Sequence, residues 1–264
     1  MNLSIQNSRV RLIDEGAGAP VLLLHGVPDN ADMWAGVIAR LAPRFRCIAP
    51  DLPGLGSSEA PAGFDCTLDS MAAWVDSLVT DLGIDQPLHV VVHDFGGPYG
   101  LAWAVRHPAQ VRSLTISSTN FFSDYRWHSA ARMWRTPVLG EIGLALVTKS
   151  VWRSQMRKFA PGLSDAYIDQ GFTMSIANPA VRRMIMRLYR TTNPENFRGW
   201  EDELLQLTAR VPTLVLWGDK DPFAPKSTAE RYGGRVEHFA EYGHWLPVEA
   251  PEVYADRLQV LFRQ

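Results

Sequence analysis

The sequence predicts an α/β fold with a mainly parallel sheet that is interrupted by an all-helical segment. Short apolar runs typical of buried strands alternate with helical segments in both end regions of the chain. From about residue 121 to residue 209 these strand patterns stop, and aromatic residues and helical periods replace them. We therefore expect a core formed by residues 1–120 and 210–264, with a helical insertion at 121–209.

Length and composition are those of an ordinary globular protein. The chain has 264 residues, is 46% hydrophobic and 20% charged, and carries a formal net charge of −2. This balance gives no sign of nucleic acid or an anionic membrane as a partner. Two cysteines provide no disulfide framework, and no Cys/His cluster has metal-site spacing. Because there is no secretory signal and no run that spans a bilayer, we expect a soluble, cytoplasmic protein without metal or cofactor.

The first half of the chain alternates between strand and helix patterns. Residues 3–13 alternate and predict one edge strand, and Pro20 to Leu24 predict a short buried strand. The same reasoning predicts helices over 31–42 and from Thr67 to about Leu82, and strands over 46–49, 88–92 and 111–117.

The second half returns to this alternation after the helical segment. The last two strands are expected at 213–217 and 235–239, followed by a helix from Pro251. Within the helical segment, Ser164 and Asn178 are suitable helix N-caps. Loops at the carboxyl ends of parallel strands meet at one edge of the sheet and form the site. Three of these loops carry ionisable side chains: Asp94, Asp221 and His244.

Residues 91–97, Val-Val-His-Asp-Phe-Gly-Gly, stand between an apolar strand run and a helical run. Small residues at 96 and 97 allow the helix to pack closely behind a sharp turn. Such a turn lifts the Asp94 carboxylate above the end of the sheet, where N–H groups of the helix start also point. A simple helix N-cap is the alternative interpretation of Asp94.

This stretch resembles the nucleophile elbow of the α/β-hydrolase superfamily, in the branch where Asp replaces Ser, which includes epoxide hydrolases and haloalkane dehalogenases. Val92 occupies the position of the elbow's first Gly. The segment His25-Gly26-Val27-Pro28 resembles the HGxP motif of epoxide hydrolases, in which the proline often follows a cis bond. Residues 51–58 resemble the superfamily's D-x-x-G-x-G-x-S loop. The resemblance implies an α/β-hydrolase fold, with a mostly parallel eight-stranded sheet flanked by helices and an all-helical cap domain.

The chain order nucleophile, acid, histidine is that of this superfamily. Asp94, Asp221 and His244 match it, since Asp221 ends a G-x-x-D segment and His244 follows the last expected strand. Asp219 is the competing acid. Because Asp94 is already ionised near pH 7, the expected task of His244 is to activate water, oriented by Asp221. Two other histidines are expected to shape the site: His25 and His93.

An Asp nucleophile changes the chemistry that a Ser would perform. Attack on an ester carbonyl would give an anhydride, whereas attack on a saturated carbon gives a stable alkyl-enzyme ester. Water then attacks the carbonyl carbon of Asp94, and the N–H groups of Phe95 and Val27 hold the oxyanion. The expected activity is hydrolysis at an sp³ carbon that bears a leaving group, in a small apolar organic substrate.

The resemblance favours an epoxide over a halide. Haloalkane dehalogenases bind halide with a Trp after the nucleophile, together with an Asn in the HGxP motif or a cap Trp, but Phe95 and Val27 have no donor. Phe95 also excludes the Arg of fluoroacetate-type dehalogenases. Epoxide hydrolases protonate the epoxide oxygen with cap tyrosines, and Tyr189 is the best candidate because it lies at the edge of an apolar helical stripe. Its partner is expected to be Tyr125, with Tyr167 or the pair Trp127–His128 as substitutes.

Two other functions remain open. A dehalogenase with a rearranged halide site would use Trp127 or Trp134 and Asn120. A non-hydrolytic member, such as a lyase, cyclase or ligand sensor, would use Asp94 as base or anchor. We expect a monomer or homodimer. Four arginines of one expected helix are predicted to form a solvent-exposed face, and binding of an acidic substrate is the alternative. They are Arg182, Arg183, Arg187 and Arg190.

Overall fold

The computed structural model describes all 264 residues, and its strands form one eight-stranded sheet. The strand order is β1-β2-β4-β3-β5-β6-β7-β8. β2 is antiparallel to both of its neighbours, and all pairs from β4 to β8 are parallel, which confirms the mostly parallel sheet. The strands are β1 (Asn2–Ile5), β2 (Ser8–Glu15), β3 (Ala19–Leu24), β4 (Phe45–Pro50), β5 (Leu88–His93), β6 (Val111–Ser117), β7 (Thr213–Gly218) and β8 (Arg235–Phe239).

Helices cover both faces of the sheet because its central strands are apolar on both sides. In β3, Leu22 and Leu24 join one buried cluster, and Val21 and Leu23 join the other. The first face is covered by α2 (Leu68–Asp81), α3 (Gly96–Arg106) and α9 (Trp200–Thr208), and the second by α1 (Ala35–Leu41) and α11 (Pro251–Phe262).

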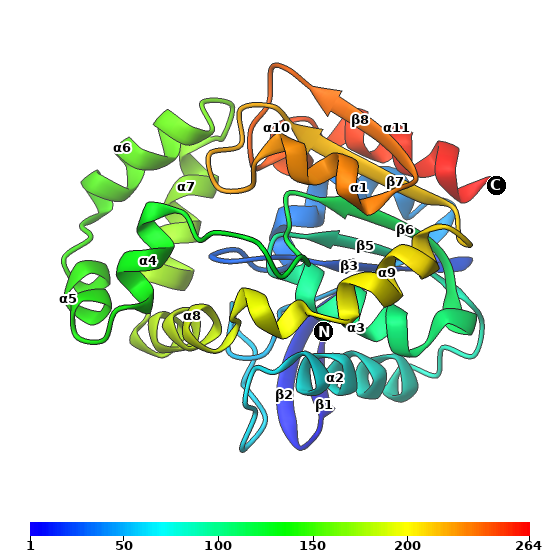
Figure 1. Cartoon of the computed structure of the whole chain (residues 1–264), viewed down its shortest axis with the longest axis horizontal. Helices are drawn as coiled ribbons and strands as arrows, with labels where there is room; N and C mark the ends of the chain where they lie inside the picture. The colour runs from blue at the N-terminus through cyan, green and yellow to red at the C-terminus, as the bar shows by residue number, and fades with distance from the viewer.

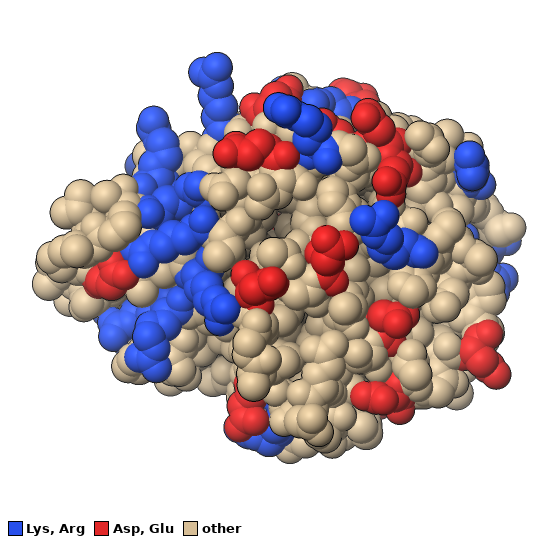
Figure 2. All heavy atoms as spheres, turned by 60° about the horizontal axis from the view of Figure 1, so that its bottom comes forward, with Lys and Arg blue, Asp and Glu red and all other residues tan.

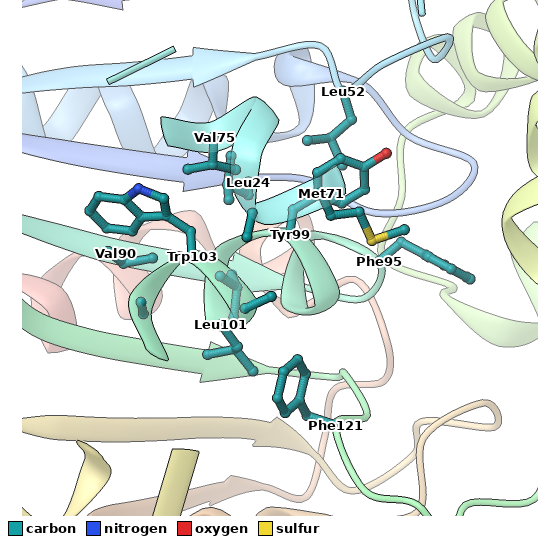
Figure 3. Close-up of a cluster of buried hydrophobic side chains, with 14 of the residues drawn as sticks. Leu24, Leu52, Met71, Val75, Val90, Phe95, Tyr99, Leu101, Trp103 and Phe121 are labelled. Atoms are coloured by element: carbon teal, nitrogen blue, oxygen red, sulfur yellow. The ribbon is translucent and has the colours of Figure 1, made fainter. Parts of the chain in front are cut away.

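Figure 3 shows the first of these clusters, in which side chains of α2 and α3 meet the strands. Met71 of α2 and Tyr99 of α3 pack near Leu24 of β3, and all three side chains are fully buried. Phe95 lies at the edge of the cluster, where the sheet ends. The first turn of α3 is therefore supported from below by the core.

Five helices that follow β6 and precede α9 in the chain lie together on one side of the sheet (Figure 1). We call residues 126–190, which contain all of these helices except the last residue of α8, the helical insert. Within the longer segment predicted to be helical, α9 packs against α3 and buries Leu204 and Leu207 in the core. The helices of the insert are α4 (Ser129–Arg135), α5 (Leu139–Ala145), α6 (Lys149–Phe159), α7 (Asp165–Gly171) and α8 (Pro179–Thr191).

The prediction of one edge strand over residues 3–13 was wrong. The chain reverses at Gln6 and Asn7, whose φ angles of 50° and 59° form a two-residue turn between β1 and β2. Two consecutive left-handed residues match the twist of a hairpin, which alternation alone cannot reveal. The two N-caps are confirmed, since Ser164 and Asn178 accept hydrogen bonds at the starts of α7 and α8.

The remaining helical segments are short. They are α10 (Leu246–Glu249), 3₁₀ turns at Ala31–Trp34, Pro108–Gln110, Pro194–Phe197 and Lys226–Tyr232, and a π-helical turn at Phe172–Ile176. The 3₁₀ turn Ala31–Trp34 precedes α1. The expected helix over 31–42 is therefore split into two parts. Cys47 and Cys66 are both free and buried. None of the helices combines the length and apolar character needed to cross a membrane.

Candidate active site

Asp94 stands on a sharp turn between β5 and α3. Its φ angle is +49°, a left-handed conformation that a non-glycine residue adopts only where its surroundings hold it. Gly96 packs so closely on β3 that an added Cβ would collide with the backbone oxygen of Leu24. The backbone oxygen of Asp94 also accepts a hydrogen bond of 2.6 Å from Thr119 Oγ1. The predicted elbow is therefore present, and it raises Asp94 at the edge of the sheet.

The two oxygens of the Asp94 carboxylate have different surroundings. Oδ1 accepts a hydrogen bond of 2.7 Å from the backbone N–H of Val27, and the N–H of Phe95 also donates to the carboxylate. Oδ2 lies 3.7 Å from Nε2 of His244. A Cβ on Gly26 would collide with this carboxylate, so only glycine allows the approach. Oδ1 is thus held by the Val27 N–H, while Oδ2 faces the imidazole.

His244 is oriented by the predicted acid. Its Nδ1 lies 2.8 Å from Oδ2 of Asp221. The other oxygen of Asp221 accepts from the backbone N–H groups of Phe223, at 2.8 Å, and Ala224, at 3.0 Å. The competing Asp219 instead contacts Nδ1 of His238 at 2.7 Å. The structure brings Asp94, His244 and Asp221 together and leaves Asp219 outside.

Burial and charge set the protonation of this group. Burial raises the pKa of Asp94 to about 6, against the lowering effect of His244 and of the two backbone donors. Burial also lowers the pKa of His244, but the charges of Asp221 and Asp94 outweigh it and raise that pKa to about 9. The pKa of Asp221 is lowered, because the charge of His244 and three hydrogen bonds outweigh burial. At neutral pH the site therefore holds carboxylates around an imidazolium.

The other two histidines line the framework, as expected. Nε2 of His93 lies 2.8 Å from the backbone oxygen of His244, and Nε2 of His25 accepts from the N–H of Leu52 at 2.9 Å. Burial lowers the pKa of His93 to about 3 and also lowers that of His25. Both rings are neutral and fully buried, so they support the loops that carry the site.

Tyr189 of α8 lies opposite Asp94. Its side chain is 4% exposed, and its ring packs 4.9 Å from Phe95 and 5.0 Å from Trp134. Its hydroxyl has no hydrogen-bond partner in the protein, and both cavities beside Asp94 are lined by this residue. Burial and the nearby charge of Asp94 raise its pKa well above the ordinary value, so the hydroxyl keeps its proton.

Tyr125 and Trp127 line the same region from the segment before α4. The hydroxyl of Tyr125 donates to the backbone oxygen of Phe223 at 3.0 Å. The Trp127 ring stacks on Phe95 at 6.2 Å, and its Nε1 is buried without a partner. Asn120 also lines this region, although its amide donates to the backbone oxygen of Phe122.

Two cavities meet at Asp94. The smaller has a volume of about 40 Å³ and is bounded by Phe95, Tyr125 and Trp127. The larger has a volume of about 610 Å³, is lined mainly by apolar side chains of α4, α5 and α6, and also reaches His244. Tyr189 borders both. An elongated apolar molecule can therefore lie with one end in the small cavity and the rest in the large one.

Sequence reasoning missed Asp29, a buried carboxylate that joins the insert to the core. It accepts hydrogen bonds from the hydroxyl of Tyr167 in α7 and, at 2.9 Å, from Nε1 of Trp245. Its place directly after the HGxP motif was a signal, as was the Trp that follows His244. With its hydroxyl on Asp29, Tyr167 lines neither of the two cavities beside Asp94.

The expectation of a solvated face for four arginines was wrong for Arg190. Its guanidinium pairs with Glu141 of α5 at 2.6 Å and donates to the backbone oxygen of Trp134 at 3.1 Å. It therefore holds α4 and α5 against α8. Arg183 and Arg187 are exposed, and Arg182 is half-buried.

Comparison with known proteins agrees with this geometry. The chain is 29% identical over 263 residues to haloalkane dehalogenase 2 of Mycobacterium tuberculosis, covering 92% of this chain and 88% of that protein. It is 27% identical over 271 residues to cis-3-alkyl-4-alkyloxetan-2-one decarboxylase of Shewanella oneidensis, covering 95% and 84%. It is 25% identical over 259 residues to epoxide hydrolase 3 of Mus musculus, covering 90% and 68%.

A solved structure and a family model complete the comparison. Cfl2 from Burkholderia cenocepacia superposes with a TM-score of 0.84 at 21% identity, over 99% of this chain and 94% of that one, which shows a shared fold. The family model described as alpha/beta hydrolase fold matches residues 19–251. The chain therefore belongs to the α/β hydrolase fold family and is an enzyme of that family.

Proposed function

We propose that the protein hydrolyses an epoxide to a diol through a covalent ester on Asp94. One observation carries this choice of leaving group. The Tyr189 hydroxyl is buried beside Asp94, keeps its proton and has no protein partner, whereas the side chains of Phe95 and Val27 offer no donor. An epoxide oxygen needs a proton donor when its ring opens, and a halide needs none.

In the first step, Oδ2 of Asp94 attacks one carbon of the epoxide. The bond between that carbon and the ring oxygen breaks, and Tyr189 gives its proton to the oxygen. The Val27 N–H, 2.7 Å from Oδ1, holds the carboxylate in one orientation and leaves Oδ2 as the attacking atom. The products of the step are a hydroxyalkyl ester on Asp94 and a tyrosinate at Tyr189.

Once the ester has formed, His244 passes its proton to the tyrosinate at Tyr189 and becomes neutral. In the second step, this neutral imidazole takes a proton from water, and the hydroxide attacks the carbonyl carbon of Asp94. The N–H groups of Val27 and Phe95 then hold the oxyanion that forms on Oδ1. The ester bond breaks and releases the diol. His244 is then an imidazolium, Asp94 a carboxylate and Tyr189 a protonated phenol, as at the start, so that one epoxide and one water give one diol.

Alkylation of Asp94 itself prepares His244 for this second role. In the free enzyme, the charges of Asp221 and then Asp94 raise the pKa of His244 to about 9. Formation of the ester removes the negative charge of Asp94, so the pKa of His244 falls. The imidazole therefore becomes able to act as a base when the ester is in place, and Asp221 keeps it oriented.

The two cavities suggest the shape of the substrate. About 40 Å³ on one side of Asp94 accommodates a hydrogen or a small alkyl group, and about 610 Å³ on the other side accommodates a long apolar group. We propose a small apolar epoxide with unequal substituents, reacting near one end. In this proposal the part of residues 121–209 that ends with α8 acts as a cap over a core formed by residues 1–120 and 210–264, and α9 belongs to that core.

Carbon–halogen hydrolysis is the second candidate, and a specific observation favours it. Nε1 of Trp127 is a buried donor without a partner, and this side chain lines the small cavity next to Phe95. The similarity to a haloalkane dehalogenase, at 29% identity, agrees with this reading. In this case Trp127 would hold the departing halide while Asp94 attacks the carbon.

The test compares three substrate panels with one pair of variants. Purified enzyme is incubated with terminal epoxides, bromoalkanes and cis-3,4-dialkyl-oxetan-2-ones, and diol, bromide and carbon dioxide are measured. We expect diol formation to dominate and to fall roughly 10²-fold in Tyr189→Phe, because the proton donor is lost. The control Tyr242→Phe, whose hydroxyl is outside both cavities, should keep the wild-type rate.

Bromide release that is unchanged in Tyr189→Phe but lost in Trp127→Phe would show that the substrate is a haloalkane and not an epoxide. Carbon dioxide release without diol or bromide would favour the non-hydrolytic alternative, to which the decarboxylase relative points.

A further inference from the structure

The outer end of the helical insert exposes an unusual number of large apolar side chains. Of nine large hydrophobic residues that are exposed in the whole chain, six lie between residues 133 and 151. We call these six the apolar tip. They extend from the end of α4 through α5 to the start of α6: Met133, Val138, Leu139, Ile142, Leu146 and Val151.

The apolar tip is continuous with the large cavity. Met133 and Val151, 41% and 48% exposed, belong to the tip and also line that cavity. The buried Leu144 and the half-buried Val147 continue the apolar lining inward. A molecule leaving an apolar phase at the tip would therefore meet apolar surface all the way to Asp94.

Charge is distributed very unequally between the insert and the rest of the chain. Residues 126–190 contain eleven Lys and Arg against three Asp and Glu, a formal charge of +8. The rest of the chain contains fifteen Lys and Arg against twenty-five Asp and Glu, a formal charge of −10. The net charge of −2 thus hides a basic region, and the sequence-based conclusion about membranes considered only that sum.

Most of the positive charge in the insert is not neutralised locally. Its three carboxylates pair with four of the basic side chains. Figure 2 shows Lys and Arg gathered around a largely uncharged end of the molecule, on the side where Figure 1 places α5. The seven cations without a carboxylate partner are Arg126, Arg132, Arg135, Lys158, Arg182, Arg183 and Arg187.

We propose that the apolar tip and its surrounding cations dock on an anionic lipid surface, so that the mouth of the large cavity faces the bilayer. Apolar side chains that enter the interface and cations that meet lipid phosphates are the two forces that hold peripheral proteins there. A second copy docked tip to tip would oppose two charges of +8 and close the mouth. A lipid surface instead matches the charge and delivers apolar substrate.

The test measures co-sedimentation of the full chain with vesicles of phosphatidylcholine alone or mixed with phosphatidylglycerol in equal parts. We expect binding only to the mixed vesicles, and release as the salt concentration rises. Leu139→Ser/Ile142→Ser/Leu146→Ser should bind at least about ten-fold more weakly, since less apolar surface enters the interface. Arg132→Glu/Lys158→Glu/Arg183→Glu should bind equally weakly, because repulsion replaces attraction.

Control variants carry the same kinds of substitution elsewhere on the surface. Leu205→Ser/Val260→Ser alters two exposed apolar residues of the core, and Arg44→Glu/Arg210→Glu/Arg263→Glu changes the net charge by the same amount. Both should bind like the wild type. Circular dichroism and thermal unfolding show that each variant is folded.

Several outcomes would overturn the proposal. They are failure of the wild type to bind mixed vesicles, unchanged binding by both insert variants, and equal weakening by the controls. A dimer in light scattering that the serine variant abolishes, without vesicle binding, would assign the tip to a second copy. None of these measurements depends on the reaction proposed for Asp94.

Discussion

The sheet edge and the helical insert meet at Asp94, but they are built by different means. At the sheet edge, short hydrogen bonds hold the reacting side chains: the Val27 N–H lies 2.7 Å from Asp94, and Asp221 lies 2.8 Å from His244. In the insert, aromatic rings pack around a Tyr189 hydroxyl that has no partner. The first region has little freedom to change and suits a fixed reaction, whereas the second is adaptable and suits the choice of substrate.

The largest expected effect tests whether the sheet edge carries the chemistry. Asp221→Ala should lower turnover by roughly 10³- to 10⁴-fold, because His244 loses the partner that orients it and raises its pKa. Asp219→Ala should change turnover by no more than about two-fold, since that carboxylate contacts His238. Steady-state kinetics on one substrate compares the two variants. A loss in Asp219→Ala that equals or exceeds the loss in Asp221→Ala would contradict the choice of Asp221 as the acid.

Two glycine substitutions compare the rigidity of the two regions. Gly26→Ala should lower turnover about 10²-fold in a folded protein, because its Cβ would displace the Asp94 carboxylate. Gly143→Ala, in α5, meets only the flexible end of Met133 at 3.0 Å. This change should keep turnover within about two-fold and stabilise the helix by up to about 1 kcal/mol. Turnover and urea unfolding of both variants provide the measurement, and the reverse ranking would refute the comparison.

The pH dependence of ester formation examines the electrostatics of the sheet edge. Asp94 must be ionised to attack, and its pKa of about 6 predicts that alkylation slows about ten-fold per pH unit below that value. His244 lowers the pKa of Asp94, so His244→Gln should move this acid limb to higher pH. Single-turnover rates of ester formation between pH 4 and pH 8 measure the acid limb in the wild type and in the variant. A shift to lower pH in the variant would contradict the account.

The smallest expected effect concerns the contact between the two regions. Tyr167→Phe removes one of the two side-chain donors to the buried Asp29 and should lower the free energy of unfolding by about 1–3 kcal/mol. The loss should be larger at high pH, where Asp29 is ionised and needs the donor. Tyr242→Phe is the control. Urea unfolding that gives equal values for both variants would show that the bridge contributes nothing.

The sheet edge was largely predictable from the sequence, because its residues follow strand ends. Apolar runs end directly before His25, His93 and Gly218, and Asp94 follows His93. Spacing after the last two strands selected Asp221 and His244. The elbow's strained φ angle and the cis bond before Pro28 agree with what the motifs implied. Local sequence determined these positions, so a single chain sufficed.

The insert was predictable in character and less so in detail. Helical periods and N-caps such as Asn178 revealed its helices, but the contacts of Tyr125 with Phe223 and of Tyr167 with Asp29 join residues far apart in the chain. Arg190 looked like a surface residue because its partner Glu141 lies one helix away in space. Such pairings depend on how the helices pack, which periodicity does not specify.

Charge distribution was likewise hidden from composition. A net charge of −2 arises from +8 on the insert and −10 elsewhere, and only the grouping of α4–α8 on one side makes this a surface property. The two regions therefore differ in surface charge as well as in how they hold the side chains of the site.

The most direct test of the central claim is the intact mass of His244→Gln after incubation with a terminal epoxide. Without its base, the enzyme should stop at the ester and gain the mass of the whole epoxide, with the adduct located on Asp94 by peptide mapping. Asp94→Ala should gain nothing. An unmodified His244→Gln protein in the presence of substrate that the wild type consumes, or an adduct that persists in Asp94→Ala, would contradict covalent catalysis by Asp94.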